Sequence, residues 1–125
     1  MPQPVVVEIE GVTLRGELLD TPPAQALARL LPLTVKLSRW GEEYYGDLGE
    51  PLGSFQGETQ TVMSVGDLAY WEPGNAFCIF FGPTPASSGP EPVAASQVHP
   101  LGRVEGDWQA LSALGGSVTA KISAA

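Results

Sequence analysis

The chain has 125 residues, 43% of them apolar, and a formal net charge of −8, which is typical of one globular domain covering residues 1–125. Nucleic acid and acidic membrane surfaces are disfavoured as partners, because only six lysines and arginines are available to neutralise phosphate groups. Cys78 is the only cysteine, so no internal disulfide can form, and we expect it to be a buried, inert thiol.

No secretory leader and no apolar run of membrane-spanning length is visible in the sequence. We therefore expect a cytoplasmic protein without a membrane segment.

The chain opens with two alternating segments that predict an antiparallel hairpin. Val5, Val7 and Ile9 alternate with residues of a wetter face, and the same period of two continues over residues 12–18 after a turn at Gly11.

The next segment changes from a strand period to a helix period. Asp20 or Thr21 can cap a helix whose first turn accepts the prolines at positions 22 and 23, and Pro32 ends it. The apolar stripe of this helix consists of Ala24, Leu27, Ala28 and Leu31. Strand alternation then resumes over residues 33–37.

Residues 40–57 are irregular, and we expect short strand pieces and a loop there. Further strands are predicted at residues 59–65, 67–71, 77–81, 98–104 and 118–122, with a short helix capped by Asp107 before the last one. Residues 82–95 form a proline- and serine-rich loop of a length that is often functional. About eight strands and two helices predict a closed or nearly closed eight-stranded barrel with two capping helices, because closure removes exposed strand edges.

Several kinds of chemistry lack a motif in this sequence. There is no nucleotide-phosphate loop and no nucleophile elbow, and one histidine with one cysteine does not make a standard zinc site. We therefore expect no cofactor and no metal. Glu42, Glu43, Asp47 and Glu50 could offer oxygens to a hard cation, but their spacing matches no known loop, which favours a solvated acidic face.

Aromatic residues and the single histidine are the candidate binding residues. His99 can donate a hydrogen bond in a pocket, or it can be an ordinary half-buried strand residue. Neighbouring strand residues face opposite ways, so one of Phe80 and Phe81 can line a pocket, unless the strand is buried on both faces.

Arg39 and Trp40 precede a pair of tyrosines, Tyr44 and Tyr45. Such a combination of a cation and amphipathic rings suits either ligand recognition or a plain surface.

The segment GDLAYWEPGNAFCIFFGPTP at residues 66–85 resembles the hallmark of a small prokaryotic group of cyclophilin-like proteins of unknown function. A weaker resemblance to true cyclophilins runs along most of the chain. It includes the opening hairpin, the helix at residues 22–31, the segment ending in the Phe pair, and HPLGRVEG at residues 99–106.

The resemblance implies an eight-stranded barrel capped by two helices and the cis/trans isomerisation of X–Pro bonds. Carried over by position, Phe81 would be the floor of a proline pocket and His99 its wall. Arg39 lies in the region of the family's catalytic arginine, but the segment F-H-R-x-I-x2-F-x2-Q-G-G-D is absent here, as is the segment with the usual tryptophan. A guanidinium that donates a hydrogen bond to the prolyl nitrogen weakens the resonance of the amide bond. Catalysis of the isomerisation therefore depends on whether an arginine reaches that nitrogen.

Three functional hypotheses follow. The first is a binding module in which Phe81, His99 and one of Tyr44 and Tyr45 wall a shared hollow for a small apolar group or a proline-containing peptide. The second is a divergent peptidyl-prolyl isomerase with Arg39 as the electrophile. The third is a small-molecule binder or enzyme that reuses the barrel. The sequence leaves open whether the protein is an enzyme and what its oligomeric state is.

Overall fold

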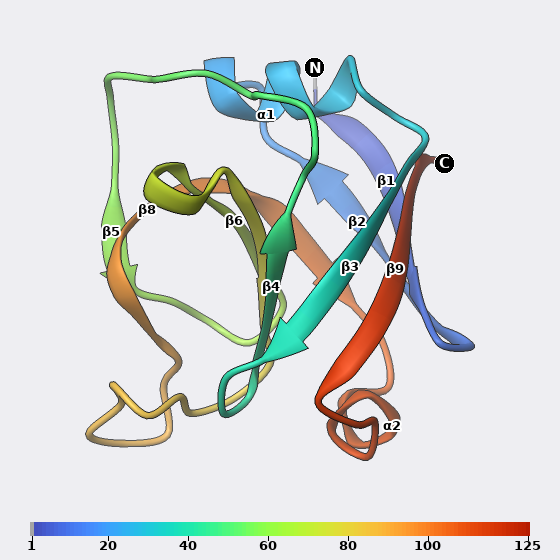
Figure 1. Ribbon diagram of the computed structural model, residues 1–125, viewed down its shortest axis with the longest axis vertical. Helices are drawn as coiled ribbons and strands as arrows, with labels where there is room; N and C mark the ends of the chain where they lie inside the picture. The colour runs from blue at the N-terminus through green and yellow to red at the C-terminus, as the bar shows by residue number, and fades with distance from the viewer. Residues whose placement is uncertain (1) are drawn as a thin grey trace.

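The computed structural model describes residues 2–125, and in this part of the chain eight of nine strands close into an antiparallel barrel (Figure 1). Around the barrel the order is β1-β2-β8-β6-β7-β4-β3-β9, and pairing of β9 with β1 completes the ring. The strands are β1 (Gln3–Ile9), β2 (Val12–Leu18), β3 (Leu33–Arg39), β4 (Glu43–Asp47), β5 (Gln60–Val62), β6 (Asp67–Trp71), β7 (Ala76–Phe80), β8 (Val93–Glu105) and β9 (Ser117–Ala124). The predicted closed barrel is confirmed.

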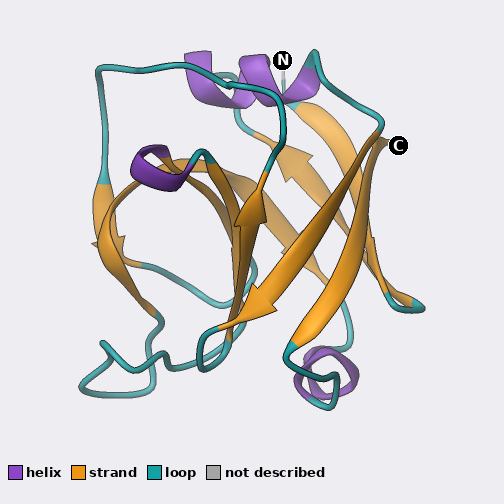
Figure 2. Cartoon of the chain, viewed as in Figure 1, coloured by secondary structure: helices purple, strands orange, loops and turns teal. Residues whose placement is uncertain are grey.

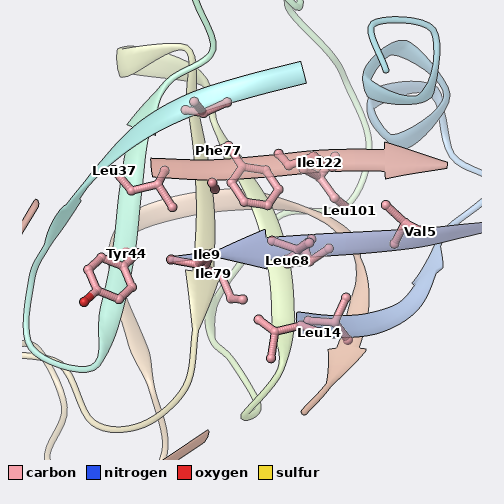
Figure 3. Close-up of a cluster of buried hydrophobic side chains, with 14 of the residues drawn as sticks. Val5, Ile9, Leu14, Leu37, Tyr44, Leu68, Phe77, Ile79, Leu101 and Ile122 are labelled. Atoms are coloured by element: carbon pink, nitrogen blue, oxygen red, sulfur yellow. The ribbon is translucent and has the colours of Figure 1, made fainter. Parts of the chain in front are cut away.

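The inward side chains of these strands form the main hydrophobic core. Val5, Val7 and Ile9 on β1 are completely buried, as their alternation predicts. Figure 3 shows how Val5, Leu68 and Ile122, from three different strands, point into one cluster. The β1–β2 turn consists of Glu10 and Gly11, both with positive φ, and it gives the predicted hairpin.

Two helices lie at opposite ends of the barrel (Figure 2). α1 (Pro22–Ala28) begins with proline at its first positions, and Thr21 is its N-cap residue but makes no side-chain capping bond. α2 (Trp108–Ser112) is capped as predicted, because the backbone N–H of Ala110 donates to Asp107 Oδ1 at 3.1 Å. A one-turn 3-10 helix, η1 (Glu72–Gly74), joins β6 to β7.

The two halves of β8 pair with different strands. The second half pairs with β6 and β2 inside the barrel, whereas the first half leaves the barrel and pairs with the short strand β5. In Figure 1, β5 and the first half of β8 stand on one side of the barrel. β8 therefore begins earlier than predicted. β5 is shorter than predicted, because the chain turns where Ser64 and Asp67 hydrogen-bond to each other.

The layer beneath β5 and β8 is a second hydrophobic cluster, on the outer face of the barrel. The buried residues of this outer cluster are Met63, Ala69, Ala76, Cys78, Phe80, Ala94 and Val98. This outer cluster covers the second face of β7, and all five residues of the strand are therefore buried.

The barrel closes at the β2–β8 seam, where glycines allow a close approach of the two backbones. A Cβ added at Gly16 would collide with the carbonyl oxygen of Arg103, and one added at Gly102 would collide with that of Glu17. The register pairs Gly16 with Val104 and Leu18 with Gly102. The seam therefore depends on the missing side chains of both glycines.

We expect Gly16→Ala to lower the free energy of unfolding by about 3 kcal/mol, because the new methyl group would force the β2 and β8 backbones apart. Gly89→Ala is the matched control, since an added Cβ there meets nothing within 4 Å. Urea denaturation of both variants measures the difference. A Gly16→Ala protein as stable as the Gly89→Ala protein would contradict this account of the seam.

Candidate functional site

Three of the sequence-predicted site residues, Arg39, Tyr44 and Phe81, meet at the α2 end of the barrel. The Tyr44 and Phe81 rings stack with centroids 5.5 Å apart, and the Arg39 guanidinium lies 5.8 Å and 5.4 Å from these two ring centres. Tyr44 is buried, and its hydroxyl donates to the carbonyl of Gly115 at 2.6 Å. In Figure 3 the Tyr44 hydroxyl points away from the rest of the core.

The guanidinium of Arg39 is fully occupied by protein acceptors. Its Nε donates to the Gly41 carbonyl at 2.8 Å, and Nη1 donates to the carbonyls of Ser112 and Leu114 at 2.7 and 2.9 Å. Nη2 donates to Glu42 Oε2 at 3.0 Å and to the Ser112 hydroxyl at 3.3 Å. The one bond from Nε, the two from Nη1 and the two from Nη2 account for all five N–H groups of an arginine. Arg39 therefore fastens the end of α2 to the β3–β4 turn, and no N–H remains to reach a prolyl nitrogen.

We expect Arg39→Lys to lower the free energy of unfolding by about 2 kcal/mol, because an ammonium cannot serve five acceptors held in a planar arrangement. Arg103→Lys is the matched control. Arg103 pairs with Asp67 at 3.2 Å but its side chain is 54% exposed, so that substitution should change stability little. Denaturation midpoints compare the two variants, and equal midpoints would show that Arg39 is not a structural clamp.

His99 lies at the other end of the barrel, in a second aromatic group. It stacks on Tyr70 at 6.2 Å and meets the edge of Phe55 at 6.0 Å. Its Nε2 lies 3.5 Å from Glu72 Oε1, which also accepts the backbone N–H of Phe55 at 3.3 Å. That N–H lowers the pKa of Glu72 from its ordinary value. These contacts hold the loop between β4 and β5 against the barrel.

The prediction that Phe81 and His99 wall one hollow is wrong. Tyr70 on β6 lies opposite His99 on the neighbouring strand β8 and opposite Phe77 on the other neighbouring strand, β7. Phe81 comes four residues after Phe77, which is about 13 Å further along the strand direction. The antiparallel register therefore separates the two rings to opposite ends of the barrel.

The prediction that one of the two phenylalanines lines a pocket while the other packs in the core is also wrong. Phe80 belongs to the outer cluster and Phe81 to the barrel core, and the two are 0% and 6% exposed. The alternative holds, in which both are core aromatics on a strand buried on both faces.

An apolar pocket lies elsewhere, on the outer face of the barrel between β4, β6, β7 and the first half of β8. It has a volume of about 270 Å³. Its lining residues are Trp40, Glu43, Tyr45, Trp71, Cys78, Ala94, Ala95 and Val98. Among the residues predicted as a binding site, Tyr45 alone lines this pocket, and it is 38% exposed.

Glu43 is the only carboxyl group that lines this pocket. It is 6% exposed, and its Oε1 has no hydrogen-bond partner among the described residues. Burial raises its pKa from the ordinary 4.5 to about 7, while contact with the Cys78 thiol opposes that shift. Burial and the neighbouring Glu43 in turn raise the pKa of Cys78, which keeps the thiol protonated. The predicted burial of Cys78 is confirmed. Glu43 does not belong to a solvated acidic face, which corrects the prediction for this residue.

We expect Glu43→Gln to stabilise the protein more at pH 8 than at pH 5. The folded protein keeps the Glu43 proton up to about pH 7, whereas the unfolded chain loses it near pH 4.5. Between these values the folded state binds more protons, so this group makes the free energy of unfolding fall as pH rises, by roughly 3 kcal/mol in all. Glutamine removes that dependence.

Urea denaturation of the wild type and of Glu43→Gln at both pH values isolates this effect, because all other titrating groups cancel in the difference. A stability difference that is the same at pH 5 and pH 8 would mean that Glu43 titrates normally.

Sequence reasoning missed Glu43, Trp71 and Ala94 as pocket residues. One signal was available, because strand alternation puts Glu43 on the same face of β4 as Tyr45. The opposite wall of the pocket, formed by the first half of β8, could not be predicted, because the proline- and serine-rich pattern of residues 82–95 indicates a loop.

Two kinds of feature are absent from residues 2–125. No helix there is both long and apolar enough to span a bilayer, and no three histidine, cysteine or acidic side chains gather at a distance suited to a metal ion.

Comparisons with known proteins give a consistent result. A family model described as cyclophilin-like matches residues 3–122. The solution structure of a hypothetical protein from Archaeoglobus fulgidus is similar, with a TM-score of 0.80 and 27% sequence identity, over 99% of this chain and 95% of that one. No curated protein sequence matches.

Proposed function

The chain belongs to the cyclophilin-like family, and we propose that it is a binding module whose outer pocket takes a small apolar group, such as the proline ring of a peptide. The observation that carries this proposal is the pocket itself. Ligand sites are concave and mostly apolar, with a few polar groups that fix orientation. The outer pocket has this composition, with rings from Trp40, Tyr45 and Trp71 around one carboxyl group.

The size of the pocket supports a small occupant. An apolar cavity of about 150 Å³ accepts a benzene ring. The pocket's volume of about 270 Å³ therefore leaves room for one ring and a short substituent, but not for a nucleotide or a long peptide segment.

Binding without catalysis is favoured over an isomerase by the state of Arg39. Isomerisation needs a donor that is free to approach the prolyl nitrogen. Arg39 uses its N–H groups within the protein and does not line the pocket. The residues that do line it offer no guanidinium or ammonium group.

A chemical-shift titration tests this function, and the tryptophans provide the readout. The chain has three of them. Trp40 and Trp71 line the pocket, whereas Trp108 packs against the barrel core and serves as an internal control. We expect acetyl-Ala-Pro-amide or benzyl alcohol to shift the Trp40 and Trp71 indole signals saturably and to leave Trp108 unchanged. In a proline-isomerisation assay the same peptide should interconvert at its uncatalysed rate.

Tyr45→Ala should weaken this binding at least about fivefold, because it removes one aromatic wall of the pocket. Val62→Ala is the control, since Val62 is 55% exposed and lies outside the pocket. Saturable shifts confined to Trp108, or none with either probe, would overturn the proposed function. Acceleration of proline isomerisation would instead show that the pocket catalyses.

A further inference from the structure

One oxygen of the buried Glu43 carboxyl group lacks the hydrogen-bond partner that a buried acid normally has. Buried charges in proteins are paired or hydrogen-bonded, because an isolated one is costly to remove from water. Glu43 Oε1 is inaccessible to solvent and has no hydrogen-bond partner among residues 2–125. Glu43 also lines the outer pocket, so its carboxyl group is the acidic group there that a ligand can pair with.

Among the described residues, none that lines the pocket carries a positive charge. From β7, Cys78 is the titratable neighbour of Glu43, and Tyr45 lies on the same strand. β8 contributes alanines and a valine, while the Nε1–H of Trp71 on β6 is already donated to the Ser96 hydroxyl at 2.7 Å. The neighbouring cation, Arg39, is held by Glu42 and by the end of α2.

We propose that the ligand of the outer pocket is a small apolar amine, bound as a cation with its ammonium N–H donating to Glu43 and its apolar body against Trp40, Tyr45 and Trp71. This inference rests on the proposed binding function and names the chemical class of its ligand. The faces of tryptophan and tyrosine rings attract cations, and a charge-assisted hydrogen bond to a carboxylate is about twice as strong as a neutral one. A net charge of −8 also draws small cations towards the protein.

Binding of such a cation is coupled to the loss of a proton. Burial holds the proton on Glu43 up to about pH 7, and the ammonium group stabilises the ionised carboxylate. Below this pH each bound amine therefore displaces close to one proton from Glu43 into solvent. A neutral ligand of the same shape displaces none.

Benzylamine and benzyl alcohol are the two probes, because they differ only in an ammonium or a hydroxyl group on the same apolar body. We expect the wild type to bind benzylamine at least tenfold more tightly than benzyl alcohol at pH 8, and this preference to shrink at pH 5. Calorimetry at pH 6 in buffers of different ionisation enthalpy should show proton release with benzylamine alone.

Glu43→Gln is the decisive variant, and it should abolish the preference for the amine over benzyl alcohol. Glu91→Gln removes the same charge from an exposed loop position, and it should keep the preference. The proton-release measurement uses the wild type only, so the inference stays testable if Glu43→Gln does not fold.

The outcomes separate this inference from the function on which it rests. Equal affinity of the wild type for the two probes, or an amine preference that survives Glu43→Gln, would overturn the amine while leaving the apolar binding site in place. Failure of both probes to shift Trp40 and Trp71 would overturn both proposals.

Discussion

The burial of β7 on both faces is the constraint on which the rest of this structure depends. A strand in a small barrel normally presents one face to the core and the other to water. Here Phe77 and Ile79 face the barrel core, whereas Cys78 and Phe80 face outward, and all four are buried. The outward pair must be covered, and the first half of β8 with β5 provides the cover.

The candidate site is a consequence of that second layer. The cover is built from small residues such as Ala94 and Ala95, which do not fill the space above Cys78 and beside Trp71. Glu43 lies at this gap with an unsatisfied oxygen, in surroundings apolar enough to keep its proton near neutral pH. Strongly perturbed pKa values such as that of Glu43 cluster at functional sites. Arg39 and His99, which the sequence indicates as site residues, instead hold loops and a helix end against the two ends of the barrel.

The sequence predicted those parts of the fold that local patterns determine. Alternation gave the β1–β2 hairpin, and turn residues at Gly66 and at positions 73–75 delimited β6 and β7. The sequence of β7 is apolar throughout and has no alternation between polar and apolar residues. Its pattern therefore could not show that both faces of the strand are buried. The separation of Phe81 from His99 depends on strand register, which single-strand patterns do not contain. The burial of Glu43 could not be predicted either, because a glutamate in a segment rich in acidic residues is typical of an exposed surface.

The most direct test of this account is the titration of the Glu43 carboxyl carbon, followed by carbon-13 NMR in the free protein. An apolar outer layer without a cationic partner predicts a midpoint near pH 7. A midpoint near the ordinary 4.5 would contradict the account, because it would place the carboxyl group in water or beside a positive charge.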